Sequence, residues 1–285
     1  MVNKAVAWML GALLSFCLMA VAARELSSSL DTFQVLFFRS ATGLLVVLSI
    51  LFFTRRWTEV KTERWFLHLS RNVVHLAGQY GWFLAIALLP LAEVFALEFT
   101  VPLWTAVLAF LLLKEKLTVR KIAAIAFGFA GVVVIVQPGF ESINHGTMIM
   151  LAAAVGYSLA HVATKSLSQT ESPLSIIFYM SLIQLPIAGA LAASDWQWPQ
   201  DYQWGWLGII GVTSLSAHYC ISSAMKYADA TVVVTMDFLR LPAIAVVGAV
   251  AYGEKIEVAL IIGALLMLAG NLINTFKPRN AKLNE

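Results

Sequence analysis

Two carboxylates lie where charge is costly. The stretch LAEVFALEFTVPLW, residues 91–104, carries Glu93 and Glu98 within an apolar run that is long enough to cross a bilayer. An ionisable side chain near the middle of such a run costs a few kcal/mol on insertion scales, so it normally faces a cavity or a charged partner. These residue types in this setting predict recognition of a polar solute, or exchange of a proton, inside a membrane.

Glu98 has no basic residue at helical spacing on its own helix. A carboxyl that is buried alone favours its protonated form. We therefore predict that Glu98, together with Asp237, couples transport to protons or recognises a cation. The alternative is a structural acid that is hydrogen-bonded to a neighbouring helix.

A polar stripe follows one face of the run at 65–89. His68, Arg71, His75 and Gln79 are spaced by three, four and four residues, and Asn72 lies beside them. Residues at these spacings share one face of a helix, so the stripe predicts a wet face. Arg71 has an alternative reading, in which its side chain extends to the cytoplasmic headgroups. The deeper His75 and Gln79 cannot be explained in that way.

Two further arginines lie inside apolar runs, and each has a structural alternative. Arg39 is expected either to bind an anion or to pair with Glu93, which lies at a similar depth. Asp237 and Arg240 are three residues apart on one helix and could neutralise each other. A purely structural pair is a poor stabiliser in a membrane, because desolvation offsets most of the attraction. We therefore include Arg240 as a candidate for binding a substrate carboxylate.

Histidine and aromatic side chains complete the candidate site. His161 and His218 each lie within an apolar run and are either cavity residues or packing residues. Aromatic rings that could stack on a planar solute, or simply pack between helices, are Trp82, Trp104, Tyr80 and Tyr219. The sequence has no HExxH spacing and no Cys/His cluster, so we expect no bound metal and no cofactor. Cys17 and Cys220 are predicted to be buried thiols.

The elements that position these residues are expected to be membrane helices. The chain has 285 residues, of which 60% are hydrophobic and 12% charged, whereas a soluble domain carries about 25% charged residues. Spans of about 20 apolar residues suit a hydrocarbon core of roughly 30 Å, and backbone in lipid must be helical. The predicted spans are 4–23, 33–53, 65–89, 91–113, 119–136, 147–167, 175–193, 204–225, 229–252 and 256–276. The first run is too long for a typical signal peptide, so we expect it to be retained.

The basic residues predict the orientation of these ten spans. Fourteen of the 19 Lys and Arg fall in the terminal segments and the loops on the same side as them, whereas the opposite loops contain only Arg24 and Lys255. The positive-inside rule therefore places both termini in the cytoplasm. We expect the chain to lie in the cell inner (cytoplasmic) membrane. The loop SDWQWPQDYQW at 194–204 is acidic and rich in Trp, which is typical of an outer interface.

The opening stretch recurs later in the chain. FALEFTVPLWTAVLAFLLLKEKL is matched by VVTMDFLRLPAIAVVGAVAYGEKI, which pairs Glu98-Phe99 with Asp237-Phe238, Glu115-Lys116 with Glu254-Lys255, and Pro102 with Pro242. Five spans per half is an odd number, so the second half is inverted. The sequence thus predicts an all-α membrane protein, an inverted 5+5 repeat of ten transmembrane helices around a central cavity. We expect repeats at 4–138 and 143–278 and a cytoplasmic tail at 279–285.

Prolines and small residues predict how the helices move and pack. Pro102 and Pro242 each remove a backbone hydrogen bond, so we expect kinks at symmetric places in two gating helices. Small residues allow close helix packing, either between the halves or in a homodimer. They are Ala126, Ala130, Gly263, Ala269 and Gly270.

These features resemble the drug/metabolite transporter superfamily, EamA type, over nearly the whole chain. The resemblance rests on ten spans in two halves, a mid-helix proline in each half, and the KEK and GEK exits. DTFQVLFFRS at 31–40 and LSRNVVHLAG in the third span are similar to the branch with S-adenosylmethionine and riboflavin carriers and organic-metabolite exporters. The resemblance implies a small-solute secondary carrier with a central cavity and no ATPase domain.

We therefore expect a secondary transporter that moves a small organic metabolite by alternating access, as an exporter. The mixed charges favour a zwitterionic or carboxylate-bearing solute, such as an amino acid or an amino-acid-derived metallophore. An importer of a nucleoside-like or vitamin metabolite is the alternative. A membrane enzyme is disfavoured, because the loops at 54–64 and 194–203 carry no catalytic constellation, and a channel would not need the paired acids and prolines. Expected partners are the solute, protons, the bilayer and a second copy of the chain, but no nucleic acid.

Overall fold

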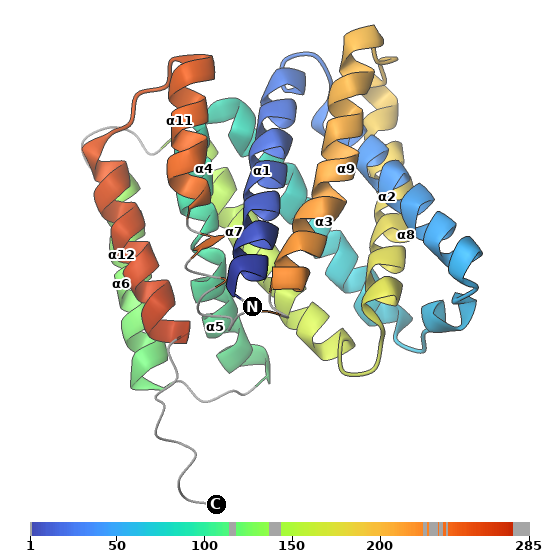
Figure 1. Ribbon diagram of the computed structural model, residues 1–285, viewed down its shortest axis with the longest axis horizontal. Coiled ribbons are helices and arrows are strands. Elements are labelled where there is room, and N and C mark those ends of the chain that lie inside the picture. Colours follow the sequence, from blue (N-terminus) through green and yellow to red (C-terminus); the bar gives the residue numbers. More distant parts are fainter. Residues whose placement is uncertain are drawn as a thin grey trace, which may run out of the picture.

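The computed structural model is a bundle of α-helices (Figure 1). It describes residues 2–113, 118–136, 144–224, 227, 233, 236–237 and 239–275, and no strand occurs among them. The helices are α1 Val2–Leu26, α2 Thr32–Thr54, α3 Trp65–Leu88, α4 Leu91–Glu98, α5 Val101–Leu113, α6 Val119–Val136, α7 His145–Leu167, α8 Pro173–Ala192, α9 Asp201–Ala224, α11 Arg240–Tyr252 and α12 Val258–Thr275. Short 3-10 turns, η1 Trp57–Val60 and η2 Ala193–Asp195, lie in two of the links.

The apolar runs predicted these helices closely. Run 33–53 became α2 and run 175–193 became α8, each within a few residues. Run 91–113 is divided into α4 and α5, and the first part of run 229–252 lies largely outside the described residues. The predicted limits at 138, 143 and 278, the tail at 279–285 and the KEK exit also lie outside them.

Five described segments are long and apolar enough to cross a membrane. Their bounds are Lys4–Leu26, Thr32–Thr54, Leu91–Leu112, His145–Leu167 and Pro173–Asp195. The described helices Arg240–Tyr252 and Val258–Ile273 are apolar but shorter. The expectation of an all-helical membrane protein is therefore confirmed at this coarser level.

Polar side chains begin several helices. Asp31 accepts hydrogen bonds from the amides of Phe33 and Gln34 at the start of α2. Asn144 and Ser172 cap α7 and α8 in the same way. Each capping side chain accepts hydrogen bonds from amides that have no partner within the helix, and this determines the residue at which the helix begins.

The most extensive contacts join the first half of the chain to the second. α1 packs along α9, α3 along α7, α2 along α8 and α6 along α12. Figure 1 shows α6 beside α12 at one edge of the bundle and α1 beside α9 nearer its middle. Neither half therefore has a complete interior of its own.

Glycines bring two of these pairs into close contact. A Cβ added at Gly156 of α7 would lie 3.4 Å from the Cα of Gly78 in α3. A Cβ at Gly131 of α6 would lie 2.6 Å from the carbonyl oxygen of Gly263 in α12. The small residues of the tenth span thus pack against the other half, whereas Ala126 and Ala130 are exposed.

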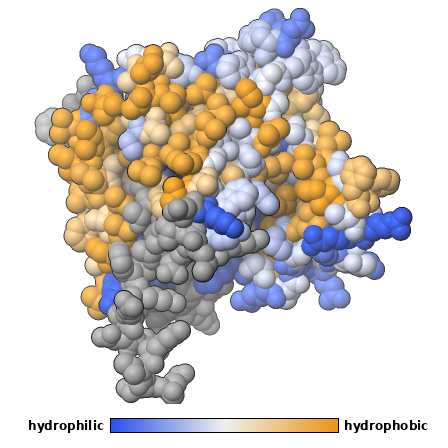
Figure 2. All heavy atoms as spheres, in the orientation of Figure 1, coloured by the Kyte–Doolittle hydropathy of each residue, from blue (hydrophilic) through white to orange (hydrophobic). Residues whose placement is uncertain are grey.

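The distribution of polarity is the reverse of that in a soluble protein. Large apolar side chains such as Phe53, Val119 and Val250 are more than four-fifths exposed. Figure 2 shows hydrophobic atoms across the side of the bundle and hydrophilic atoms gathered toward its upper and lower edges. Arginines, histidines and amides are buried inside. An apolar exterior of this extent matches a surrounding of lipid.

A polar contact joins the two halves at the end of the bundle opposite the start of α1. Arg24 pairs with Glu254 at 3.0 Å and donates to the carbonyl oxygen of Leu89 at 2.5 Å. Glu254 also accepts a hydrogen bond of 2.8 Å from the amide of Leu91, the first residue of α4. The Glu of the predicted GEK exit therefore caps a helix of the first half.

The glycine contacts predict that Gly131→Ala destabilises the protein. The added methyl would meet a backbone oxygen, which cannot move aside as a flexible side chain could. We expect a loss of about 1–3 kcal/mol of unfolding free energy, measured by thermal unfolding in detergent. Gly208→Ala is the matched control, because a Cβ there has nothing within 4 Å. Equal losses in both variants would contradict this account of the α6–α12 contact.

Candidate functional site

The two predicted acids lie near the ends of described helices. α4 ends at Glu98 and α5 begins at Val101, while α11 begins at Arg240, shortly after Asp237. Interrupted helices inside a membrane leave backbone groups to be satisfied by ligands, water or side chains, and in transporters they mark the binding region.

The prolines lie just after the starts of α5 and α11. Pro102 is the second residue of α5 and Pro242 is the third residue of α11. The amides of a first helical turn have no partner within the helix, so proline is tolerated there. The structure thus differs from the expected kink within a continuous helix. In the fourth span it shows a break, with proline opening the helix that follows.

Arg240 lies between the two acids. Its Nη2 donates to Oδ2 of Asp237 at 2.6 Å, and its Nη1 lies 3.6 Å from Oε1 of Glu98. The indole of Trp82 donates to the other oxygen of Glu98 at 2.8 Å. Glu98 therefore has a cationic partner, contrary to the reading of its own helix alone, because the partner belongs to the other half of the chain. We call Glu98, Asp237 and Arg240 the Arg240 cluster.

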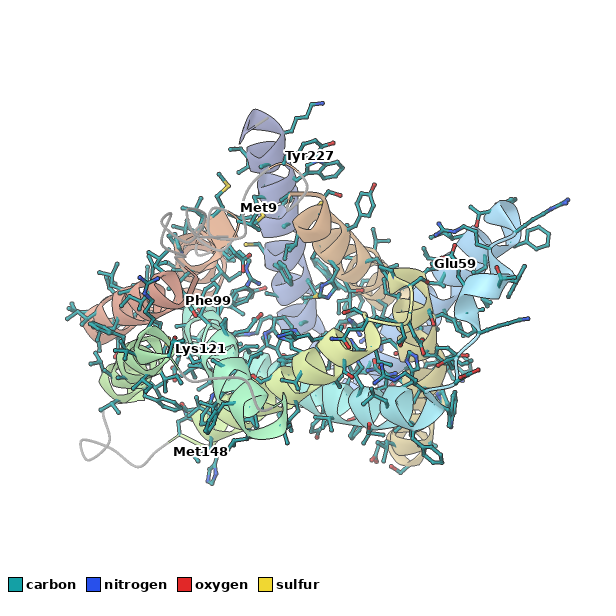
Figure 3. The ribbon with its side chains drawn as sticks, turned by 90° about the horizontal axis from the view of Figure 1, so that it is seen from below. Met9, Glu59, Phe99, Lys121, Met148 and Tyr227 are labelled. Atoms are coloured by element: carbon teal, nitrogen blue, oxygen red, sulfur yellow. The ribbon has the colours of Figure 1, made fainter. Side chains whose placement is uncertain are left out.

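Aromatic rings enclose the guanidinium of Arg240. Its Cζ lies 4.2 Å from the ring centroid of Phe16, 5.2 Å from that of Phe99 and 5.6 Å from that of Phe95. Seen from below, Phe99 lies inside the bundle, between helices (Figure 3). Rings at these distances stabilise a cation by cation–π attraction, most strongly where water is excluded.

The Arg240 cluster is not fully satisfied. Oδ1 of Asp237 and the Nε and Nη1 of Arg240 are buried and have no hydrogen-bond partner among the described residues. A buried polar atom without a partner costs free energy unless water or a ligand reaches it. These unpaired atoms leave room in the Arg240 cluster for a hydrogen bond to water or to a ligand.

Arg39 and Arg71 form a second group, which we call the arginine pair. Arg71 of α3 donates to Oγ1 of Thr164 at 3.1 Å and to Oδ1 of Asn72 at 2.5 Å. It is 8% exposed, so its side chain does not extend to the headgroups. Arg39 of α2 is also 8% exposed and makes no hydrogen bond or ion pair in the part of the chain that the structure describes.

The alternative pairing of Arg39 with Glu93 does not form. Glu93 instead accepts a hydrogen bond of 2.9 Å from Oγ1 of Thr147 in α7. A similar depth in the membrane was a poor guide to contact here, because depth does not say which faces of two helices meet.

Histidines surround the arginine pair. The charges of Arg39 and Arg71 act on the rings of His75 and His218, and that of Arg71 also acts on His161. Nδ1 of His75 lies 3.0 Å from Nε2 of Gln184. The side chains of His161 and His218 are solvent-exposed although they lie among these interior groups. Both residues therefore keep exposed surface next to the arginine pair.

Two predicted residues, Gln79 and Trp104, and one residue that was not predicted, Tyr157, lie near these groups. Tyr157 interacts electrostatically with both Arg39 and Glu98, and its ring meets that of His75 edge to face. Gln79 is buried, with an unpaired side-chain oxygen. Trp104 packs edge-on against Phe129, and its buried Nε1 has no partner among the described residues.

Some contributing residues were not singled out from the sequence. Phe16, Thr164 and Gln184 contact the predicted arginines or histidines from α1, α7 and α8. Gln184 could have been identified, because it is a polar residue inside the apolar run at 175–193. Phe16 and Thr164 carry no such signal, since an apolar run contains many similar residues.

His68 belongs to a different polar contact at the cytoplasmic end predicted for α3. Its Nε2 lies 2.6 Å from Oε2 of Glu171, which also accepts hydrogen bonds from Thr62 and from Ser175. Burial acts to raise the pKa of Glu171, but the hydrogen bonds from Thr62, His68 and Ser175 outweigh burial and hold that pKa below its usual value. His68 is therefore not part of the deeper polar group that contains Arg71, His75 and Gln79.

The described residues contain no group of three or more His, Cys, Asp or Glu placed to hold a metal ion. What the arrangement offers is a lipid-facing bundle with charged and polar groups inside it, at interrupted helices between two halves. This combination defines the class of polytopic transporters for small polar solutes.

Comparison with known proteins identifies the family. The sequence profile of the EamA-like transporter family matches residues 3–137 and again residues 144–276. The chain belongs to this family, and it is a small-molecule transporter of the membrane rather than an enzyme.

Characterised relatives cover almost the whole chain. The chain is 24% identical to the S-adenosylmethionine uptake transporter of Rickettsia felis, covering 97% of this chain and 94% of that one. It is 28% identical to the riboflavin transporter of Vibrio cholerae, covering 92% and 89%. It is 26% identical to the pseudopaline exporter CntI of Pseudomonas aeruginosa, covering 89% of each chain. A solved crystal structure with 20% identity shares the fold, with a TM-score of 0.66 over 96% of this chain and 98% of the other.

The Arg240 cluster predicts that Arg240→Met is strongly destabilising. Two partly buried carboxylates would lose their cation, which costs at most about 3–5 kcal/mol of unfolding free energy. The triple variant Arg240→Met, Glu98→Gln and Asp237→Asn removes the uncompensated charges and should recover part of this loss. Thermal unfolding in detergent measures both variants, and a triple variant no more stable than the single one would refute the assignment.

The lowered pKa of Glu171 predicts a dependence of stability on pH. Because the folded pKa lies below the ordinary value of about 4.3, this group stabilises the fold above that pH, and its contribution is lost as the pH falls through the lowered folded value. Glu171→Gln should therefore flatten the acid side of a plot of unfolding temperature against pH. The exposed Glu63→Gln is the control and should keep the parent profile.

Proposed function

We propose that this chain is a secondary carrier that exports a small organic metabolite across the cytoplasmic (inner) membrane by alternating access. The solute is zwitterionic or carboxylate-bearing, such as an amino acid or an amino-acid-derived metallophore. The observation that carries the proposal is the contact between Glu98 at the end of α4 and Arg240 at the start of α11. It places opposite charges from the two halves at two interrupted helices, where a solute can compete for either partner.

The helix pairing supports an inverted 5+5 repeat with ten spans. Counting α4 and α5 as the fourth span makes α7, α8, α9 and α12 the sixth, seventh, eighth and tenth. When each helix is replaced by its counterpart five spans away, the contact between α1 and α9 becomes the contact between α7 and α3. The contacts α2–α8 and α6–α12 each join a helix to its own counterpart. The two separate profile matches agree with repeats at 4–138 and 143–278 and a short tail at 279–285.

Both termini are assigned to the cytoplasm. The beginning of α1 and the end of α12 lie at the same end of the bundle (Figure 1). Most of the Lys and Arg residues fall in the terminal segments and in the loops that the ten-span reading puts on that side, which the positive-inside rule assigns to the cytoplasm.

The second candidate function is uptake of a nucleoside-like or vitamin metabolite. The relatives named as S-adenosylmethionine uptake and riboflavin transporters favour it. The export proposal draws instead on the relative named as a pseudopaline exporter and on the buried arginines.

A comparison of metabolites in cells and medium, with and without the protein, tests substrate and direction. Export predicts a solute that accumulates in the medium only when the protein is present. Reconstituted protein should then exchange labelled for unlabelled solute in counterflow, because a carrier couples the two fluxes and a channel does not. Depletion of the solute from the medium would instead support the uptake function.

Glu98→Gln tests proton coupling. Glu98 lies between Arg240 and Trp82, so a proton bound there would release its hold on Arg240. We expect the variant to lose the dependence of transport on a pH gradient while solute exchange at equal pH persists. Asp237→Asn should have a similar effect if the two acids share the role. Gradient-driven transport by Glu98→Gln that equals the parent across pH would exclude Glu98 from coupling.

A further inference from the structure

The carboxylates of the described interior are already engaged. Glu98 and Asp237 face Arg240, and Glu93 accepts a hydrogen bond from Thr147. Toward the two ends of the bundle, Glu171 is bound to His68 and Glu254 to Arg24. Within the described part of the chain, no carboxylate remains to neutralise the arginine pair.

Arg39 has donors and charge but no protein partner. Its side chain is more than nine-tenths buried and makes no hydrogen bond or ion pair with a described residue. A guanidinium carries five N–H donors in a planar fork that matches a carboxylate. Burying such a group without a counter-charge is costly unless water or an anion reaches it.

Arg71 adds a second positive charge beside the first. Its two described partners, Thr164 and Asn72, are neutral acceptors, so they orient the guanidinium without cancelling its charge. The charges of Arg71 and Arg39 lie close enough to repel each other. Two like charges held together in a medium of low polarity create a site of positive potential, which an anion relieves.

Exposed polar surface adjoins this region. The rings of His161 and His218 are exposed, although the charge of Arg71 acts on both. Nδ2 of Asn72 and the side-chain oxygen of Gln79, which lie on the same face of α3, are buried without partners in the described chain. A polar ligand would therefore find unfilled donors and acceptors around the arginine pair.

We propose that Arg39 and Arg71 form the subsite that binds a carboxylate of the transported solute, with Arg39 donating to it directly and Arg71 held in place by Thr164 and Asn72. This assignment rests on the proposed transport function and separates the roles of the three interior arginines. Arg240 is the less favourable anion site, because Glu98 and Asp237 already balance its charge. The solute class is an organic anion or zwitterion with a free carboxylate, not a purely cationic compound.

Binding is tested first without a known solute. Sodium malonate, malonamide and inorganic phosphate, at matched ionic strength, serve as probes of thermal unfolding in detergent. We expect malonate to raise the unfolding temperature of the parent and malonamide to leave it unchanged. Stabilisation by phosphate but not by malonate would overturn the carboxylate assignment, and so would the same shift with malonamide as with malonate.

Variants of Arg39 separate a binding role from a structural one. Arg39→Gln removes an uncompensated charge, so without a probe it should unfold at the same or a higher temperature than the parent, while the malonate shift is lost. Arg39→Lys should retain part of the shift, because it keeps the charge. Arg56→Gln alters an exposed arginine paired with Glu59, and it should keep the full shift. A probe-free Arg39→Gln that is less stable than the parent, or a malonate shift that survives in it, would overturn the proposal.

Transport kinetics distinguish failure of the subsite from failure of the carrier function. For the solute found by counterflow, Arg39→Gln should raise KM about 10- to 100-fold, the usual effect of losing a hydrogen bond to a charged group. An unchanged KM would remove the subsite and leave the carrier function intact. Malonate binding that depends on Arg39, in a protein that shows no counterflow with any solute, would leave the subsite intact and remove the carrier function.

Discussion

One cation shared by two carboxylates holds the centre of this protein together. A buried charge is tolerated in a membrane only with a partner of opposite sign, and the partners of Arg240 come from both halves of the chain. Separating the two halves at this point would leave at least one of the three charges without a partner of opposite sign. The interrupted helices, the enclosing phenyl rings and the indole of Trp82 are arranged around that requirement. A movement that separates α4 from α11 would therefore break the contact between Glu98 and Arg240.

The two charged groups of the interior have opposite balances. The Arg240 cluster combines two acids with one arginine, whereas the arginine pair has two cations and no acid among the described residues. Tyr157 interacts electrostatically with Glu98 of the first group and with Arg39 of the second. This separation produces an internal electric field along which a dipolar solute would be oriented before any specific contact is made.

The helices, most of their ends and the identity of the interior residues could be predicted from the sequence. Apolar run length determines a membrane helix almost directly, and a charge inside such a run must avoid lipid. The spacing along one helix predicted the pairing of Asp237 with Arg240, but the pairing of charges on different helices could not be predicted. Sequence spacing shows no cation for Glu98 and leaves Arg39 either an anion or Glu93 as its partner, because spacing along one helix says nothing about which face of a distant helix lies opposite. The break between α4 and α5 could not be predicted either, since the apolar run continues through both pieces.

The pairing of α1, α2, α3 and α6 with helices from the second half has a consequence for biogenesis. While the ribosome is still making residues beyond 144, the first helices have entered the bilayer without the surfaces they will pack against. Arg39 and Arg71 then sit in lipid or in the insertion machinery with incomplete surroundings, and Arg71 still lacks Thr164. The nascent first half is therefore an unfinished intermediate that quality-control proteases can recognise, and its survival depends on how quickly translation delivers the second half.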